Sequence, residues 1–322
     1  MGCSASVPKQ AQALDTPTAP APAPEVPTAL PTQAQAVDNP TAPAPAVPTA
    51  DTTISASGAA AVKNAGGISV KAWAAADTST TFGRVSAGMV VLANARWTRT
   101  VLQPGAQWRE DVLPHAATAE PGKQWCPVRR VGMVESGTVE VTMEDGAQQV
   151  LTAGMAFAIG PGHDVRVLGS SPAVCIDVES RLSGGLAKDA EGGGGSDAVS
   201  LLGKSFADAP DKTIRFPPGT EPLLGIACVC VLGPNAKAMR GVLQPGWTWT
   251  ECVRPMLPEG MRDRTSCPAR HVGFVAKGIL HLCHADGTER DVKAGECYVC
   301  EPDHDAWVVG EEAVEFYEFE ST

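Results

Sequence analysis

Apolar and polar positions alternate in the last third of the chain, where residues Ile279 to Cys283 read ILHLC and Asp286-Gly287 follows. A period of two is typical of a strand with one buried face, and an Asp-Gly pair supplies the left-handed turn of a hairpin. The flanking segments 267–278 and 295–310 are rich in Val, Phe and Cys and carry glycines at their corners. Short strands joined by such corners predict a small antiparallel β-barrel.

The same pattern occurs twice in the chain, 141 residues apart. The shift carries Cys126 onto Cys267 and His163 onto His304 without a gap, and it also aligns the VLQPG segments that precede them. A register that holds over about 70 residues, with roughly a third of the positions identical, indicates a duplicated domain.

Composition divides the chain into four parts. Residues 1–65 contain long runs of Pro, Ala and Thr and predict a disordered tether, because such a segment has little apolar surface to bury. The first copy is predicted over 66–182 and the second over 198–320. Residues 183–197 are rich in glycine and predict a flexible linker between them.

The chain begins with MGCSAS, which fits the pattern for N-myristoylation at Gly2 and places Cys3 for palmitoylation. A single acyl chain holds a protein at a membrane only marginally, whereas two chains give stable attachment. If both residues are acylated, we expect the protein to bind a membrane surface through these chains and to lie on the cytoplasmic face of a eukaryotic membrane. Without acylation, a cytoplasmic protein is expected.

Charge and composition exclude several classes of function. The net charge is −11 with no basic runs, so nucleic acid is not expected as a partner. The sequence contains no run of 18 apolar residues, so it predicts no membrane-spanning helix. The ten cysteines occupy mostly strand positions where Val or Ile would serve, which indicates reduced core thiols rather than disulfides. Strand alternation places Cys297 and Cys300 on opposite faces, against a metal or redox pair.

The segments around Gly278 and His304 resemble the two sequence motifs of the cupin superfamily, here duplicated as a bicupin. The second copy is similar to a group of uncharacterised small cupins through PGWTW, CPARHVG and HDAWVVG, and the first copy matches more weakly. The resemblance implies an all-β chain of two tandem jelly-roll β-barrels after the tether. It implies little about activity, because this fold carries many functions.

Metal-binding cupins hold the ion through histidines and a glutamate in these motifs. The corresponding region of the second copy offers Cys267, His271 and His304, so the ligand set departs from the family pattern. Cys and two His suit zinc, iron or copper and leave a position for water or substrate. A different threading gives Cys252 as the thiolate. The alternative without metal is a buried thiol and two histidines that form hydrogen bonds across the barrel mouth.

The first copy has Arg130 at the position of His271. We expect this copy to bind no metal, with Arg130 either paired to Asp111 or gripping an acidic ligand. Tryptophans 247 and 249 are expected on the strand after the Pro-Gly corner, and Trp307 lies near His304. They either pack in the core or line a small-molecule pocket in the mouth.

Two functions remain open from the sequence. The first is a membrane-tethered bicupin that binds a small ligand, in a sensory role, through its second barrel. The alternative is a metal-dependent cupin enzyme of the oxygenase, isomerase or lyase type. The retained cysteine and histidines favour the enzyme, and the incomplete ligand set of the family favours binding. A purely structural role is the third and weaker interpretation.

Overall fold

The computed structural model describes residues 66–115, 122, 124–180, 200–219 and 222–321. The predicted tether, the acylation sites Gly2 and Cys3 and the Gly-rich linker lie outside these ranges. Within them, no helix is long and apolar enough to cross a membrane.

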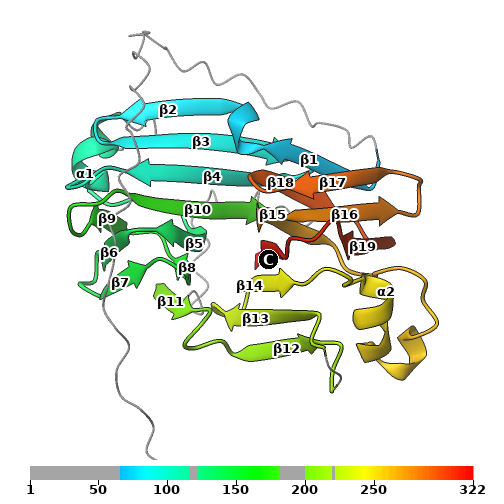
Figure 1. Ribbon diagram of the computed structural model, residues 1–322. Helices are drawn as coiled ribbons and strands as arrows, with labels where there is room; N and C mark the ends of the chain where they lie inside the picture. The colour runs from blue at the N-terminus through cyan, green and yellow to red at the C-terminus, as the bar shows by residue number, and fades with distance from the viewer. Residues whose placement is uncertain (1–65, 116–121, 123, 181–199, 220–221, 322) are drawn as a thin grey trace, which may run out of the picture. The chain divides into compact units, whose positions relative to one another are not determined.

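Almost all regular structure in the described residues is antiparallel β-sheet, as the alternating pattern predicts (Figure 1). The strands of the first half are β1 (Ile68–Ala72), β2 (Thr78–Phe82), β3 (Val85–Leu92), β4 (Ala95–Leu102), β5 (Arg130–Ser136), β6 (Thr138–Met143), β7 (Gln148–Thr152), β8 (Met155–Ile159), β9 (His163–Val167) and β10 (Ala173–Ser180). Those of the second half are β11 (Leu201–Ser205), β12 (Lys212–Phe216), β13 (Gly225–Val231), β14 (Ala236–Leu243), β15 (His271–Lys277), β16 (Ile279–His284), β17 (Glu289–Lys293), β18 (Glu296–Cys300), β19 (His304–Val308) and β20 (Val314–Ser321).

The structure contains two barrels, and each consists of a seven-stranded and a three-stranded sheet. The first barrel combines the order β11-β8-β5-β10-β4-β3-β2 with β7-β6-β9, and the second combines β1-β18-β15-β20-β14-β13-β12 with β17-β16-β19. Apolar side chains from both sheets fill the interior of each barrel, and a third core cluster joins the two large sheets. The predicted all-β architecture of two jelly-roll barrels is confirmed.

The two barrels exchange a strand. Strand β1 precedes the first barrel in sequence but pairs with β18 of the second, with Ile68 opposite Cys300. Strand β11 precedes the second barrel but pairs with β8 of the first, with Leu201 opposite Ile159. Figure 1 shows β1, in blue, beside the red and orange strands of the second half. The division of the sequence into 66–182 and 198–320 therefore does not coincide with the division into sheets.

The segment after each Pro-Gly corner is helical, so the prediction of a strand there is wrong. Helix α1 spans Trp108–Asp111 and α2 spans Trp249–Cys252. Short 3-10 turns lie at Trp73–Ala75, Leu113–His115, Arg254–Met256 and Glu259–Met261. The Thr248 hydroxyl accepts a hydrogen bond from the Glu251 N–H at 3.1 Å. Thr-x-x-Glu is a helix-capping sequence, and its local hydrogen bond outweighs the strand pattern of the tryptophans.

Candidate metal centre

Three predicted ligand side chains, those of Cys267, His271 and His304, converge in the second barrel. His271 begins β15 and His304 begins β19, and the backbone of Cys267 pairs with that of His304. The Cys267 N–H donates to the His304 carbonyl at 2.6 Å. One potential ligand atom from each side chain lies within 4.8 Å of the other two, and no other such group occurs in the part of the chain that the structure describes.

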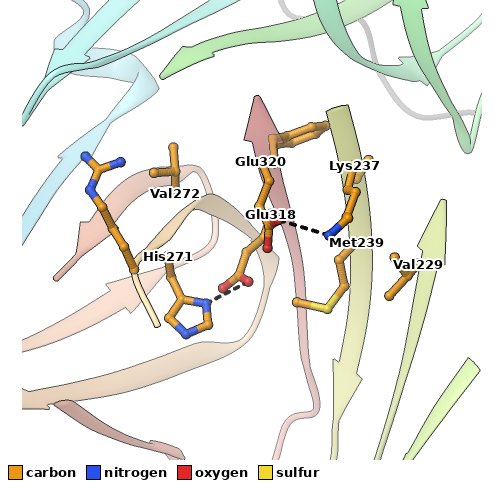
Figure 2. A pocket seen from close by; sticks show the side chains of 10 residues that line it. Val229, Lys237, Met239, His271, Val272, Glu318 and Glu320 are labelled. Carbon is orange, nitrogen blue, oxygen red and sulfur yellow. Dashed lines mark hydrogen bonds and ion pairs between the residues drawn. The ribbon is translucent and has the colours of Figure 1, made fainter. Parts of the chain in front are cut away.

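The His271 ring is held between a carboxylate and the thiol. Its Nδ1 lies 2.8 Å from Glu318 Oε2, and its Nε2 lies 3.4 Å from Cys267 Sγ. Figure 2 shows the ring turned toward Glu318 on the neighbouring strand β20. The Tyr298 hydroxyl donates to the other oxygen of Glu318 at 2.7 Å. This carboxylate therefore fixes the orientation of His271 and directs Nε2 toward Cys267.

A residue without a side chain makes room for this carboxylate. Gly273 stands opposite Glu318 in the register of β15 and β20. A Cβ at this position would lie 2.3 Å from the Tyr317 carbonyl oxygen and 2.9 Å from the Glu318 side chain. Only glycine fits there without displacing the group that orients His271.

His304 is oriented by the backbone. Its Nδ1 lies 2.6 Å from the carbonyl oxygen of Glu301, so Nδ1 carries the proton and Nε2 is left to face the cluster. The two imidazole rings lie edge to face, with centroids 5.0 Å apart. The neighbouring carboxylate of Asp305 does not orient His304, because it accepts a hydrogen bond from Thr250 at 2.7 Å. Both histidines thus have Nδ1 committed, and Nε2 of each faces the cluster.

The cluster separates charge in the absence of metal. Burial opposes ionisation of Cys267, but hydrogen bonds from His271 and His304 outweigh it and lower the pKa of the thiol to about 6. Burial likewise opposes the charge of His271, yet Glu318 and Cys267 raise the pKa of this imidazole well above its ordinary value. Glu318 is buried as well, and His271 keeps the pKa of its carboxyl below the usual range. At neutral pH the group is a thiolate, an imidazolium and a carboxylate.

A pocket opens beside His271 and Glu318 (Figure 2). Its walls come mainly from β14, β15 and β20, with Val229 added from β13, and the lining side chains include Lys237, Met239 and Glu320. Lys237 Nζ and Glu320 Oε2 lie 3.6 Å apart, and both side chains are more than half exposed, at 54% and 71%. The pocket thus has an apolar wall, a charged rim and the carboxylate-bound imidazole in its lining.

The predicted pocket tryptophans do not meet at this pocket. Trp247 and Trp249 are buried in the core of the second barrel. Trp307 alternates with the buried residues Ala306 and Val308 and stacks on His281, with ring centroids 4.1 Å apart. The alternative thiolate, Cys252, is also a core residue and is not part of the ligand cluster.

The first barrel contains a matched group of different chemistry. Arg130 Nη1 donates to Asp177 Oδ1 at 2.9 Å, and these residues stand at the positions of His271 and Glu318. Asp177 raises the pKa of the guanidinium. Burial lowers the pKa of His163, the counterpart of His304, to about 4. The first barrel thus holds a fixed positive charge where the second has an imidazolium that can give up its proton.

The predicted pairing of Arg130 with Asp111 is wrong. Asp111 accepts hydrogen bonds from the backbone N–H of Arg84 at 3.0 Å and from its Nε at 3.1 Å. This carboxylate lies in helix α1, whereas Asp177 lies on β10, which pairs directly with β5 next to Arg130. That the first barrel binds no metal stays a prediction, as does the alternative in which Arg130 grips an acidic ligand.

Sequence reasoning missed the residues that support the ligands: Glu318, Tyr298 and the carbonyl of Glu301. The internal repeat held a signal for Glu318, because the shift of 141 places it on Asp177. An acid at both positions, matched by Arg130 in one copy and His271 in the other, predicts a cross-strand partner. For the Glu301 carbonyl there was no signal, since a backbone group leaves no mark on the residue type.

Two jelly-roll barrels in tandem, with the candidate metal centre in the second, give this chain the bicupin fold. No protein family model matches the sequence, and no curated protein matches it either.

Solved structures share the fold at low identity. The oxalate decarboxylase of Lactobacillus farciminis in a formate complex matches with a TM-score of 0.52 and 12% identity, covering 79% of this chain and 86% of its own. A putative glyoxylate-induced protein from Pseudomonas aeruginosa matches with a TM-score of 0.52 and 10% identity, covering 80% and 89%. The oxalate decarboxylase of Bacillus subtilis, studied for its Mn(II) centres, matches at 0.50 and 13%, covering 78% and 76%. Identities this low establish the fold alone.

Proposed function

We propose that the second barrel is the active site of a metal-dependent enzyme that acts on a small molecule. The main support for this proposal is that the potential ligand atoms of Cys267, His271 and His304 lie within 4.8 Å of one another, with both histidines fixed through Nδ1. If the thiol and the two histidines had only a structural role, their rings would not need to be fixed by hydrogen bonds to Glu318 and to the Glu301 carbonyl. Outer partners of this kind are typical of metal ligands, because they set the ring orientation and the tautomer.

The donor set fits a transition metal. One sulfur and two imidazole nitrogens suit zinc, iron or copper, and a three-residue set leaves a position for water or substrate. Manganese, named for the Bacillus subtilis neighbour, prefers oxygen and nitrogen ligands, so Cys267 makes this centre chemically different. A metal bound here would polarise a substrate oxygen or lower the pKa of a bound water.

The residues around the centre have separate tasks in this proposal. Glu318 keeps His271 oriented, and Tyr298 keeps Glu318 in place. The side chains of Val229 and Met239 form a wall that excludes water from one side of the pocket. Lys237 at the rim offers a cation to an anionic substrate group. A substrate screen therefore begins with small carboxylic acids, including oxalate and glyoxylate.

The test is metal content together with turnover. The protein is purified without a metal-binding tag, and its zinc, iron, copper and manganese are measured by mass spectrometry. We expect about one equivalent per chain, the occupancy of a single site, and turnover in the screen that a chelator removes and the metal restores. A protein that binds no metal, even after reconstitution, contradicts the enzyme and leaves the small-ligand-binding module as the better proposal.

Metal binding is expected to release a proton near neutral pH. The pKa of His271 is raised well above its ordinary value, so its Nε2 carries a proton that must leave before this nitrogen can bind a metal. Above the Cys267 pKa of about 6, the thiol has already lost its proton. Metal affinity should therefore rise about tenfold per pH unit above pH 6, until the pH reaches the pKa of His271.

Calorimetry of metal binding in two buffers with different ionisation enthalpies measures this proton. The matched variant is Glu318→Gln, which removes the anion that holds the imidazolium and should lower the pH above which metal binding no longer releases a proton. If the wild-type protein releases none, the charge-separated cluster described above does not exist in solution.

Membrane attachment through Gly2 and Cys3 is a separate proposal, which rests on the sequence MGCSAS alone. In this proposal two acyl chains place the bicupin on the cytoplasmic face of a membrane. Mass spectrometry of the N-terminal peptide from protein made in eukaryotic cells tests it, because unmodified Gly2 and Cys3 would remove its basis.

A further inference from the structure

Arg270 links the metal centre to the first barrel. It directly precedes the ligand His271, and its side chain is only 16% exposed. Its Nη2 donates to the Ala93 carbonyl at 2.8 Å, and its Nε donates to Glu301 Oε1 at 3.1 Å. One guanidinium thus joins the turn between β3 and β4 of the first barrel to the corner that precedes His304.

Glu301 is the residue whose carbonyl orients His304. That carbonyl lies 2.6 Å from His304 Nδ1, so a movement of the Glu301 backbone turns the imidazole. The Glu301 N–H donates to the Gly67 carbonyl at 2.8 Å, just before the exchanged strand β1. The Glu301 side chain is held by Arg270. Both restraints therefore lead to residues that come from the first half of the chain.

The contact in the first barrel is a defined position rather than a loose loop. Ala93 and Asn94 have φ values of 43° and 65°, which form the tight left-handed turn of the β3–β4 hairpin. Ala93 is only 4% exposed and belongs to the core cluster between the two large sheets. Its carbonyl therefore offers Arg270 a fixed acceptor.

We infer that Arg270 is a positioning residue for the metal centre: it holds Glu301 against the first barrel and thereby sets the orientation of His304. The inference rests on the proposed function, because it concerns the same site. Arginine suits this task, since its planar fork donates in two directions at once, whereas lysine presents a single flexible ammonium. The first barrel then contributes to the metal centre of the second without supplying a ligand.

The experiment measures Co²⁺ affinity and the Co²⁺ absorption spectrum for the full chain and its variants. Arg270→Ala is expected to raise the dissociation constant about 10- to 100-fold, the usual effect of removing a group that orients a ligand. Glu301→Ala keeps the carbonyl but removes the carboxylate, and should give a similar loss. If both residues act on His304 together, the double variant should lose no more than the stronger single variant.

The controls separate positioning from folding. Arg262→Ala removes an exposed arginine whose Nε donates to the Leu257 carbonyl, and should leave Co²⁺ affinity unchanged. Thermal unfolding of each variant with chelator reports the stability of the metal-free fold, which a purely structural role would lower in parallel. Arg270→Lys keeps the charge and is the substitute if Arg270→Ala does not fold; it should show an intermediate loss.

The outcomes are distinct. A wild-type protein that binds no Co²⁺ overturns both the proposed function and this inference. A wild-type protein that binds Co²⁺ while Arg270→Ala or Arg270→Lys binds it equally well overturns the inference alone. Losses that add fully in the double variant also overturn it, because Arg270 and Glu301 would then act independently.

Discussion

Replacing both Cys267 and His271 by alanine is expected to reduce the metal content of the purified protein from about one equivalent per chain to none. The two substitutions leave a single imidazole, and one nitrogen ligand does not retain a transition metal through purification. Mass spectrometry of the metal, on protein that elutes as a folded species in gel filtration, gives the result directly.

The internal repeat supplies the matched control, Cys126→Ala with Arg130→Ala. This pair should leave the metal content unchanged, although it should cost about 3 kcal/mol of folding stability because Asp177 is left buried and unpaired. The cost lies at the low end of the range for buried pairs, since the Arg130 side chain is 28% exposed. Equal loss of metal from both double variants would mean that damage to the fold, rather than loss of ligands, empties the site.

A triple substitution in the first barrel, Arg130→His, Asp177→Glu and Phe157→Tyr, is expected to raise the metal content from about one to about two equivalents per chain, one for each barrel. Phe157 stands at the position of Tyr298, whose hydroxyl holds Glu318 in the second barrel. Histidine is shorter than the arginine it replaces, and glutamate is longer than the aspartate it replaces. The new pair of side chains therefore spans about the same gap between β5 and β10. The counterparts of Cys267 and His304 are already present: Cys126 is buried, and His163 Nδ1 lies 2.6 Å from the Gly160 carbonyl oxygen.

Arg130→His alone is the control for this gain. The shorter imidazole cannot reach Asp177 in the same way, so its ring lacks the partner that Glu318 gives to His271. We expect the single variant to stay near one equivalent. If the triple variant also stays there, the ligands and their supporting carboxylate are not sufficient, and other differences between the two barrels decide which one binds metal.

The sequence predicted more of the fold than of the candidate metal centre. The hairpin at Asp286-Gly287 and the duplication follow from local alternation and from an internal repeat, which need no knowledge of distant contacts. The grouping of Cys267, His271 and His304 was predicted from their places in or near the two cupin-like motifs. Glu318 did not, because it lies 47 residues beyond His271 and meets it only through the register of β15 and β20. Pairing register between distant strands is set by the whole barrel.

The strand exchange was beyond sequence reasoning for a related reason. Even where β1 and β11 are known to be strands, the edge of either barrel would satisfy their backbones. The helical turns at Trp108 and Trp249 are a different case. The Thr-x-x-Glu sequence at Thr248 was visible, and the strand pattern of the tryptophans was given too much weight.

The exchange of β1 and β11 makes the protein a covalent analogue of a domain-swapped dimer. Neither half is an independent module, because each lacks one edge strand that only the other half encodes. A gene fragment for residues 198–322 would leave the edge of β18 open at Cys297 to Cys300, beside the corner that carries His304. Both halves of the chain must therefore be present for either large sheet to have all seven of its strands.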